Sequence, residues 1–295
     1  MRTPTVDCLV VGAGPAGLTA ALYLRRFQRS VAVLDGGHSR ALAIEHSHNY
    51  PAFPQGISGR QLLLLLRQQL AQVGWELVAS EVKNLQRLAS GLFAATGGGR
   101  TWLAQTVLLA TGVVDAVPGV PGIEQVRERG LLRQCPICDG YEHRGKRILV
   151  LGDGLHAARE ADFIADYSPH VARAGLNKVP PAARPSVRVL AALATRVDLP
   201  PYGGLCLTLA DGSTHDFDVA YAAVGVQPCS QLGRALGAEL DGHGCLLTDT
   251  HGATCVDGLY AAGDVASGLD QLVIATSQGA IAATAIHNRL RPESL

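Results

Sequence analysis

The stretch VDCLVVGAGPAGLTAALYLRRFQRSVAVLD, residues 6–35, decides the fold of this chain. Its apolar run CLVV is typical of a strand buried on both faces of a parallel sheet. A glycine-rich turn, a helical pattern and a second apolar strand that ends in Asp35 follow it. This order of strand, turn, helix and strand predicts a dinucleotide-binding α/β unit.

The turn GAGPAG carries the phosphate-binding part of that prediction. Gly12 permits a tight turn, Gly14 lets the backbone approach a pyrophosphate, and Gly17 lets the helix pack closely on the strand. The unpaired N–H groups of the helix N-terminus then face the phosphates. Asp35 follows Gly17 by 18 residues, where its carboxylate can accept hydrogen bonds from an adenosine ribose. A tight turn without a ligand is the alternative, and the combination of strand, glycines, helix and distal acid favours a nucleotide.

A similar unit opens again at KRILVLGDGLHAAREADFIADY, residues 146–167. The end of the chain, from GLYAAGD at 258–264, has a short strand and a long helix but no strand–helix pair of its own. This order of segments predicts an α/β protein with two Rossmann-like domains, the second inserted into the first. Each domain is expected to have a three-layer ββα arrangement. We expect an FAD-binding domain at 1–112 and 246–295, and a redox domain of the NADPH-binding type at 113–245.

Composition excludes several classes of protein. The 295 residues are 47% hydrophobic and 17% charged, with a formal net charge of zero, so no nucleic-acid or anionic-membrane partner is expected. The apolar run LLLLL at 62–66 is far shorter than the roughly 20 residues that span a bilayer. The beginning of the chain lacks the pattern of a signal peptide, and we expect a cytoplasmic protein without a membrane segment.

The segment GLYAAGD indicates which dinucleotide binds. A strand that places Gly263 and Asp264 at its carboxyl end can hydrogen-bond a ribityl chain and a pyrophosphate. A helix that begins near Gln271 can aim its N-terminus at the flavin pyrimidine, where negative charge appears on reduction. An ordinary strand–turn–helix is the alternative. The segments LLATG and HNYPAFP favour the flavin.

Together, GAGPAG, HNYPAFP, LLATG, CPICD, LGDGLHAA and GLYAAGDV resemble, in order and spacing, the low-molecular-weight thioredoxin reductases. This is a family of FAD-dependent pyridine nucleotide-disulfide oxidoreductases. The resemblance implies a homodimer and a redox domain that rotates relative to the flavin domain. It implies FAD contacts at Gly12, Gly14, Pro15, Ala16, Gly17, Asp35, Asn49, Thr111, Gly112, Gly263, Asp264, Gln271 and Leu272.

The pair Cys135-Pro136-Ile137-Cys138 can be read as a zinc site, a structural staple or a redox pair. Zinc needs four ligands, usually in two clustered pairs, and the other cysteines form no second C-x-x-C, so we expect no metal. A disulfide between residues three apart closes too small a loop to stabilise much. At a helix start, by contrast, the dipole favours a reactive thiolate, and Pro136 fits the first turn. A redox pair is therefore favoured.

The resemblance also assigns roles around this pair. Cys138 should face the flavin, Cys135 should attack the external disulfide, and Asp139 should supply a proton. For Asp139 the alternative is a helix-start residue stabilised by the dipole. The partner would be a thioredoxin-like protein or a small disulfide or dithiol.

The second glycine set departs from the family pattern. Family members bind NADPH there, but Asp153 puts a carboxylate where the anionic pyrophosphate would approach. The next strand, at 170–178, lacks the arginine cluster that grips the 2′-phosphate, and only Arg173 and Lys178 stand near. We therefore expect neither NADPH nor NADH to bind tightly. The candidate contacts of this second nucleotide site are Gly152, Gly154, His156 and Ala157.

Several functions stay open at this point. The chain is either a reductase that uses NADPH or NADH weakly, or a reductase fed by ferredoxin or by a second FAD in the second site. It also resembles, through CP-x-C and GYE, the dithiol oxidases of gliotoxin-type metabolites that pass electrons to oxygen, although these usually have His where Asp139 stands. A non-catalytic flavin redox sensor is the hypothesis of another class. We favour an enzyme, because an attacking cysteine and a following acid have no obvious use in a sensor.

Overall fold

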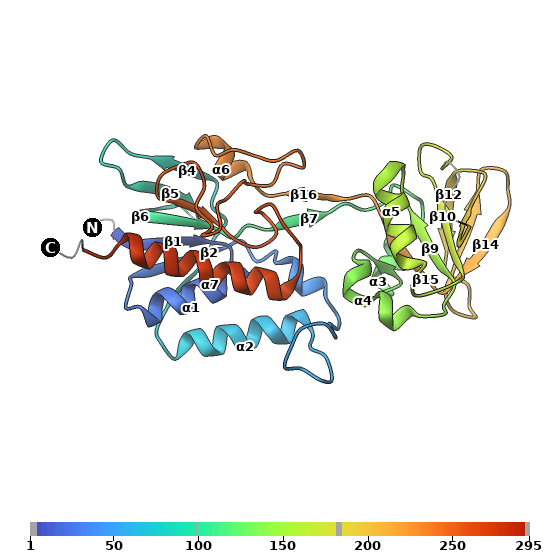
Figure 1. Ribbon diagram of the computed structural model, residues 1–295, viewed down its shortest axis with the longest axis horizontal. Helices are drawn as coiled ribbons and strands as arrows, with labels where there is room; N and C mark the ends of the chain where they lie inside the picture. The colour runs from blue at the N-terminus through green and yellow to red at the C-terminus, as the bar shows by residue number, and fades with distance from the viewer. Residues whose placement is uncertain (1–4, 98, 181–184, 293–295) are drawn as a thin grey trace. The chain divides into compact units, whose positions relative to one another are not determined.

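The computed structural model describes residues 5–97, 99–180 and 185–292, and its elements are labelled in Figure 1. The chain divides into two compact units, residues 1–114 with 227–295, and residues 115–226. The chain passes from one unit to the other through a two-stranded sheet of β7 (Val113–Asp115) and β16 (Val226–Pro228). This division has the topology of an insertion.

The sheet of the first unit has the order β3-β2-β1-β6-β5-β4, and β17 pairs with β6 in addition. The strands β3, β2, β1, β6 and β17 run parallel, whereas β4 and β5 form an antiparallel meander with β6. Their bounds are β1 (Thr5–Val11), β2 (Val31–Asp35), β3 (Glu76–Ala79), β4 (Asn84–Arg87), β5 (Phe93–Gly97), β6 (Arg100–Leu109) and β17 (Leu259–Ala261).

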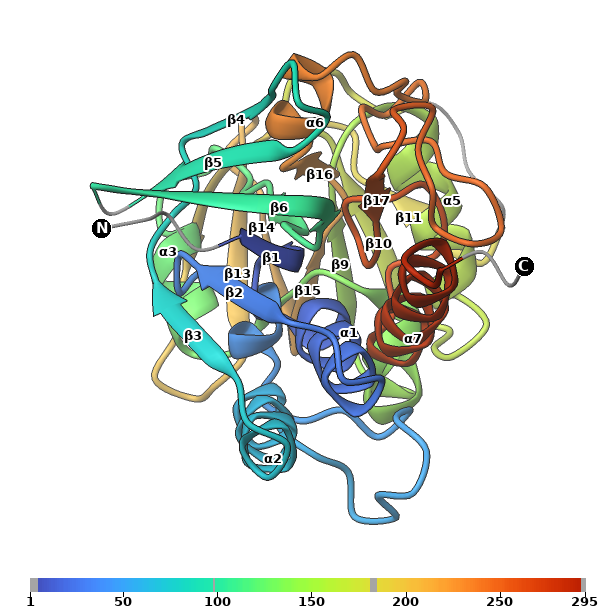
Figure 2. The ribbon, with the colours of Figure 1, turned by 90° about the vertical axis from the view of Figure 1, so that its left-hand side faces the viewer.

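Helices cover one face of this sheet, as Figure 2 shows for α1, α2 and α7. Alternation along β1 explains the layers: Cys8 and Val10 pack with these helices, and Leu9 and Val11 pack in a second core on the other face. Both faces are apolar, as the CLVV run predicts. The bounds are α1 (Pro15–Arg26), η1 (Arg40–Ala43), α2 (Gly59–Ala71), α6 (Gln231–Ala235) and α7 (Leu272–Arg289).

The first unit resumes at Gln227 and not at the expected residue 246. The physical reason lies in α6 and the loop after it, where Leu232, Leu236 and Leu240 pack against the core on the second face of the sheet. These leucines follow no strand–turn–helix signal, so the sequence pattern does not assign them to that core. The assignment of FAD to this unit stays a prediction.

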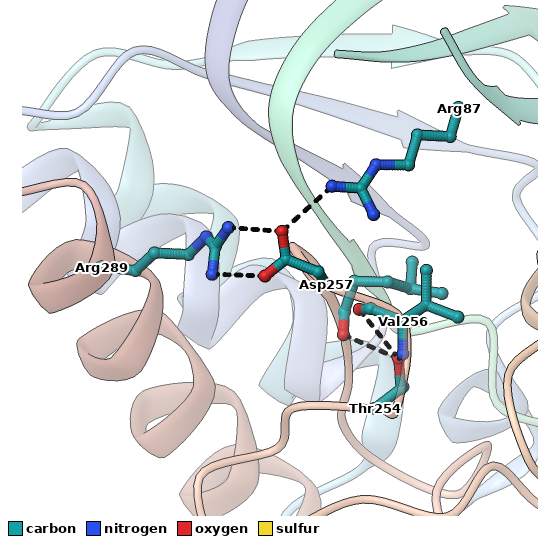
Figure 3. Close-up of polar contacts among 6 residues, drawn as sticks. Arg87, Thr254, Val256, Asp257 and Arg289 are labelled. Atoms are coloured by element: carbon teal, nitrogen blue, oxygen red, sulfur yellow. Dashed lines mark hydrogen bonds and ion pairs between the residues drawn. The ribbon is translucent and has the colours of Figure 1, made fainter. Parts of the chain in front are cut away.

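An ionic cluster holds the C-terminal helix to the rest of the first unit (Figure 3). Asp257 accepts hydrogen bonds from Arg289 Nη1 and Nη2, at 2.7 and 2.9 Å, and from Arg87 Nη2, at 3.0 Å. The loop that presents Asp257 is turned by Thr254, whose hydroxyl accepts from the Val256 N–H and donates to the Leu259 carbonyl. The cluster thus joins β4, the loop before β17 and the end of α7.

The second unit contains a five-stranded sheet of order β11-β10-β9-β15-β8 and an antiparallel meander of β12, β13 and β14. All pairs of the five-stranded sheet are parallel. Its strands are β8 (Leu132–Arg133), β9 (Ile148–Leu151), β10 (Val171–Ala174), β11 (Val187–Val189) and β15 (Val219–Ala222), and those of the meander are β12 (Ala194–Asp198), β13 (Leu205–Leu209) and β14 (Thr214–Phe217).

Alternation along β9 again separates two cores. Ile148 and Val150 pack against α5, whereas Leu149 and Leu151 pack toward the meander. The helices are α3 (Ile123–Glu128), α4 (Pro136–Asp139), η2 (Gly140–His143) and α5 (Gly154–Ile164). Each unit therefore has a parallel sheet between a helical layer and a β-meander, which confirms the expected pair of three-layer Rossmann-like folds.

Candidate functional site

The first glycine turn is built by close backbone contacts. Gly12 has φ of +103° and donates its N–H to the Leu34 carbonyl at 2.8 Å, and a Cβ on it would lie 2.3 Å from the Ala110 carbonyl oxygen. A Cβ on Gly17 would lie 1.9 Å from the Gly12 carbonyl oxygen. Only glycine fits at either position, so the roles predicted for them in turning and packing the chain are met.

The same turn presents donors to a ligand. Gly14 precedes α1, and the first helical hydrogen bond runs from the Leu18 N–H to the Gly14 carbonyl at 3.0 Å. The N–H groups of Ala16 and Gly17 come before that bond and point out of the helix end, while Pro15 fits the position where no donor is needed. Asp35, at the end of β2, accepts from the Ala13 N–H at 3.2 Å. Backbone donors and the acid predicted to bind the ribose therefore lie together.

Four parallel strands bring most of the other predicted FAD residues to one sheet edge. Leu34, Val11, Leu109 and Ala261 lie in register across β2, β1, β6 and β17. The candidate residues follow within three positions of these strand ends, at Asp35, Gly12, Thr111, Gly112, Gly263 and Asp264. Carboxyl ends of parallel strands are where open α/β sheets bind ligands.

Residues far apart in sequence also meet near the start of α7. Asn49 donates through Nδ2 to Oε1 of Gln271 at 2.9 Å, and Gln271 precedes Leu272, the first residue of α7. The Gly263 N–H donates to Gln278 Oε1 on the same helix at 2.8 Å. Two of the predicted contact residues, Asn49 and Gln271, are thus brought together by a direct hydrogen bond.

Arg40 is a residue of this region that the sequence patterns miss. Its Nη1 lies 2.9 Å from Asp264 Oδ2 and 3.3 Å from Asp270 Oδ2. It stands in the loop-like segment after β2, where no motif marks it. The only signal is a single arginine at the start of the apolar run ALAI, after the polar residues His38 and Ser39.

The cysteine pair forms a disulfide at the start of the short helix α4, in the second unit. The Cα atoms of Cys135 and Cys138 lie 5.3 Å apart, and the Cys138 N–H donates to the Cys135 carbonyl at 3.0 Å. Pro136 is the first helical residue and is buried, whereas Ile137 between the cysteines is exposed. The geometry of a C-x-x-C pair at a helix start is as expected.

Asp139 is held on both carboxylate oxygens. Arg133 Nε donates to Oδ2 at 2.5 Å, and the Tyr221 hydroxyl donates to Oδ1 at 2.7 Å. Burial, and next to it the charge of Asp139, raise the pKa of Tyr221, so the phenol keeps its proton. Neither partner was expected from the sequence, although a tyrosine in the otherwise apolar strand DVAYAAVG could have drawn attention.

At the second glycine turn the carboxylate of Asp153 is engaged by the chain itself. It accepts from the backbone N–H groups of Leu176, Asn177 and Lys178 and from Asn177 Nδ2, at 2.9 to 3.4 Å. Burial raises the pKa of Asp153, but the bonds from Asn177 and its neighbours outweigh that effect, and the net pKa lies below its usual value. Gly152 and Gly154 therefore flank a fixed anion.

Of the two basic residues near this turn, the buried Arg173 is poorly placed for a phosphate, whereas Lys178 is exposed. Arg173 lies within β10, and its side chain is 1% exposed. The Lys178 N–H is one of the donors to Asp153. On α5, Ala157 packs in the core and the exposed His156 lies 3.2 Å from Glu160, whose pKa burial raises to about 7. The turn keeps the glycine spacing but is lined with acid.

The first unit fits FAD, and the second turn does not fit an anionic dinucleotide. The fit of the first rests on the glycine cradle, the donors of α1 and Asp35. The poor fit of the second rests on Asp153 in the place of the pyrophosphate. Among the described residues, no group of three or more His, Cys, Asp or Glu side chains is placed to hold a metal ion, and no helix is long and apolar enough to cross a bilayer.

Known proteins resemble this chain along nearly all of its length. A family model described as pyridine nucleotide-disulphide oxidoreductase matches residues 6–279. The thioredoxin reductase of Treponema pallidum (strain Nichols) is 30% identical over 303 residues, which cover 95% of this chain and 95% of the relative. The crystal structure of HlmI matches with a TM-score of 0.89 at 28% identity, over 98% of this chain and 94% of HlmI. Thioredoxin reductase from Streptococcus pyogenes MGAS5005 matches with a TM-score of 0.88 at 26% identity, over 98% and 99%.

Proposed function

Because this chain belongs to the pyridine nucleotide-disulphide oxidoreductase family, we propose that it exchanges electrons between FAD and an external disulfide or dithiol through Cys135 and Cys138. That it is an FAD-dependent oxidoreductase acting on a disulfide follows from its thioredoxin reductase relatives. The observation that carries the finer proposal is the Cys135–Cys138 disulfide at the start of a helix, beside the exposed Ile137. An accessible C-x-x-C of this kind favours fast thiol–disulfide exchange.

The exchange balances as two sulfur displacements. In the reducing direction the Cys135 thiolate attacks one sulfur of the external disulfide, so a mixed disulfide forms and the other sulfur leaves as a thiolate that takes up a proton. The Cys138 thiolate then attacks Cys135, releases the second substrate thiol and closes the disulfide. The pair loses two electrons and the substrate gains them, and the reverse order oxidises a dithiol. Bound FAD supplies or accepts the two electrons that reset the pair.

The residues of the first unit provide the flavin site in this proposal. The α1 N-terminus would face the pyrophosphate, Asp35 the adenosine ribose, and the start of α7 the flavin ring. We infer FAD contacts at Gly12, Gly14, Pro15, Ala16, Gly17, Asp35, Asn49, Thr111, Gly112, Gly263, Asp264, Gln271 and Leu272.

We further infer that NADPH and NADH bind weakly at the second glycine turn. The Asp153 carboxylate at the start of α5 supports this inference, because it repels a pyrophosphate and uses the N–H groups of residues 176–178. Electrons would then come from another donor, such as ferredoxin or a second flavin, or would leave to oxygen. The thioredoxin reductase relatives support a thioredoxin-like protein as the partner. A homodimer is inferred from the resemblance of the sequence motifs to the family.

An anaerobic titration of the flavin-loaded protein tests the proposal. We expect dithiothreitol to bleach the flavin absorbance through the disulfide, and NADPH or NADH to bleach it slowly or not at all. Cys135→Ser and Cys138→Ser should retain FAD and lose the fast reduction by dithiothreitol. Equal bleaching of the wild type and both serine variants would contradict electron passage through the pair, and rapid bleaching by NADPH would contradict the weak second site.

A further inference from the structure

One arginine of the first unit joins the two ends of the segment that runs from β17 to α7. Arg40 is the first residue of η1, and its Nη1 lies 2.9 Å from Asp264 Oδ2 and 3.3 Å from Asp270 Oδ2. Asp264 follows β17, and Asp270 comes one residue before Gln271, which precedes α7. The side chains of Arg40, Asp264 and Asp270 are 23%, 18% and 32% exposed, so both ion pairs are partly shielded from water.

The arginine projects from a well-packed base. A Cβ on Gly59 would lie 1.8 Å from the Ala41 carbonyl oxygen, so η1 packs directly on the start of α2, and Ala41 itself is buried. The segment that Arg40 reaches is more exposed. It includes Gly268, whose φ is +151°, and Leu269, which is 52% exposed. The two ion pairs therefore tie an exposed segment to a packed one.

The chain just before Arg40 passes beside the first glycine turn. A Cβ on Gly14 would lie 3.3 Å from Ser39 Oγ, and Ser39 precedes Arg40 directly. On the proposed function, Gly14 faces the FAD pyrophosphate and Asp264 is another FAD contact, at the end of β17. Ser39 and Arg40 therefore connect two parts of the inferred flavin site that lie on different strand ends.

The arginine also balances charge at the start of α7. Asp264 and Asp270 bring two carboxylates to the segment before that helix, whereas the guanidinium of Arg40 cannot be deprotonated in a protein. Two-electron reduction of a flavin with uptake of one proton leaves a negative charge on the pyrimidine side of the ring. On the proposed function this side faces the helix start, whose dipole favours the charge. Nearby carboxylates oppose the charge, and a cation paired with them offsets that opposition.

We propose that Arg40 is a positioning residue of the flavin site, with two effects on FAD. Its ion pairs hold Asp264 and the segment before α7 in place, which strengthens FAD binding. Its charge offsets the two carboxylates, so that reduced FAD binds more tightly relative to oxidised FAD and the midpoint potential of the flavin rises. The inference rests on the FAD site of the proposed function, and it does not depend on the passage of electrons through Cys135 and Cys138.

Three variants and a control separate the two effects. Arg40→Lys keeps the charge, whereas Arg40→Gln removes it and keeps a hydrogen-bond donor. The double variant Arg40→Gln/Asp270→Asn removes one charge of each sign, so it restores the charge balance but not the ion pairs. Arg87→Gln is the matched control, because Arg87 pairs with Asp257 at 3.0 Å before β17, whereas Asp264 follows that strand.

The first readout is the dissociation constant of oxidised FAD. It is measured by the quenching of flavin fluorescence when FAD is added back to the apoprotein. We expect Arg40→Gln and the double variant to bind FAD about tenfold more weakly, because both lose hydrogen bonds between charged groups. Arg40→Lys should recover most of the loss, and Arg87→Gln should match the wild type.

The second readout is the midpoint potential of the bound flavin, measured against an indicator dye during slow enzymatic reduction. If a variant weakens the binding of reduced FAD tenfold more than that of oxidised FAD, its midpoint falls by about 30 mV. We expect this fall in Arg40→Gln, and a midpoint close to that of the wild type in Arg40→Lys, in the double variant and in Arg87→Gln. A purely structural role of Arg40 would weaken FAD binding without this dependence on charge.

Two results would overturn the inference. If Arg40→Gln matched Arg87→Gln in both FAD affinity and midpoint potential, Arg40 would have no part in the flavin site. If the midpoint fell equally in Arg40→Gln and in the double variant, the shift would come from a change in the shape of the segment and not from charge. Neither readout passes through Cys135 and Cys138, so a failure of the thiol exchange would refute the proposed function and leave both results decisive for Arg40.

Discussion

The two glycine turns of this chain share a backbone plan and differ in where they put a carboxylate. Gly152 follows Gly12 by 140 positions, and the same spacing relates Gly154 to Gly14 and Ala157 to Gly17. Gly12 donates to the Leu34 carbonyl of β2, and Gly152 donates to the Ala174 carbonyl of β10. A Cβ on either first glycine would collide with the carbonyl oxygen that follows the next parallel strand, Ala110 or Ala223.

In each unit a carboxylate connects the glycine turn to the end of a neighbouring strand. In the first unit the carboxylate belongs to the strand end, and in the second it belongs to the turn. In the first unit, Asp35 at the strand end accepts from Ala13 in the turn. In the second, Asp153 in the turn accepts from residues 176–178 beyond the strand end. The position equivalent to Asp35 is Gly175, where a Cβ would lie 1.8 Å from the Lys178 carbonyl oxygen. The second loop therefore folds back over its own turn and has no room for a ribose-binding acid.

This reversal shows that glycine spacing sets the turn but does not set the ligand. The helix N-terminus favours an anion in both units. In the first unit we propose that this place receives a phosphate, whereas in the second it holds the carboxylate of Asp153. On this proposal the same fold builds one nucleotide-binding turn and one turn whose helix N-terminus is occupied by its own carboxylate.

The largest effect is expected from a substitution at the third glycine of the first turn. Gly17→Ala puts a Cβ 1.9 Å from the backbone oxygen of Gly12, where no side chain can move aside. We expect a cost of about 3 kcal/mol in folding of the first unit and loss of FAD from the purified protein. Ala157→Gly, at the equivalent position of the second turn, is the control and should retain FAD. The flavin-to-protein absorbance ratio measures both, and a Gly17→Ala protein with full flavin content would refute the close packing.

The next effect tests the charge at the second turn. Asp153→Asn keeps the shape and part of the hydrogen bonding to residues 176–178 but removes the negative charge at the start of α5. We expect NADPH to bind about tenfold more tightly, equivalent to roughly 1.4 kcal/mol at a helix end. Isothermal titration of the oxidised protein measures the dissociation constant. Unchanged affinity would mean that the loop, and not the charge, closes the site.

A smaller effect concerns the acid on α5. Glu160 lies where the first unit has Ala20, again 140 positions earlier, and its Oε2 is buried without a hydrogen-bond partner among the described residues. Burial raises its pKa from 4.5 to about 7, so the folded state binds the proton more tightly than the unfolded chain. Below about pH 4.5 Glu160 does not lower the free energy of unfolding, because it is protonated in both states. As the pH rises through 7, the free energy of unfolding falls, because the buried carboxyl must then either ionise or keep a proton that the unfolded chain releases.

Glu160→Gln should therefore stabilise the protein at pH 8 by about 1 to 2 kcal/mol, after allowance for partial exposure of the side chain, and should have no effect near pH 4.5. Thermal unfolding at the two pH values measures the difference. If the variant were stabilised equally at both pH values, the cause would be a change in packing and not the loss of an ionisable group.

Sequence patterns predicted the parts of this structure that follow from local periodicity. The strand CLVV, the glycines at 12, 14 and 17, and the distal Asp35 are fixed by the spacing of one βαβ unit, and the structure places them together. Partners such as Arg133, Tyr221 and Arg40 depend on which strands become neighbours, which no local period specifies. The misplaced boundary at 246 has the same cause, because Leu232 packs through tertiary contact alone.

The smallest effect is expected at a carboxylate that lies outside both glycine turns, and it serves as a control for the charge change in Asp153→Asn. Asp257 is bound by Arg289 and Arg87, and these bonds lower its pKa, yet its side chain is 56% exposed. Its contribution to stability is present above the unfolded pKa of about 3.8 and is lost as the pH falls through the lower folded value. We expect Asp257→Asn to cost about 1 kcal/mol or less at pH 7, to cost progressively less as the pH falls below the unfolded pKa, and to leave NADPH affinity unchanged. If it altered NADPH binding as much as Asp153→Asn does, the effect at Asp153 would reflect net charge and not the second turn, and the contrast between the two turns would lose its electrostatic basis.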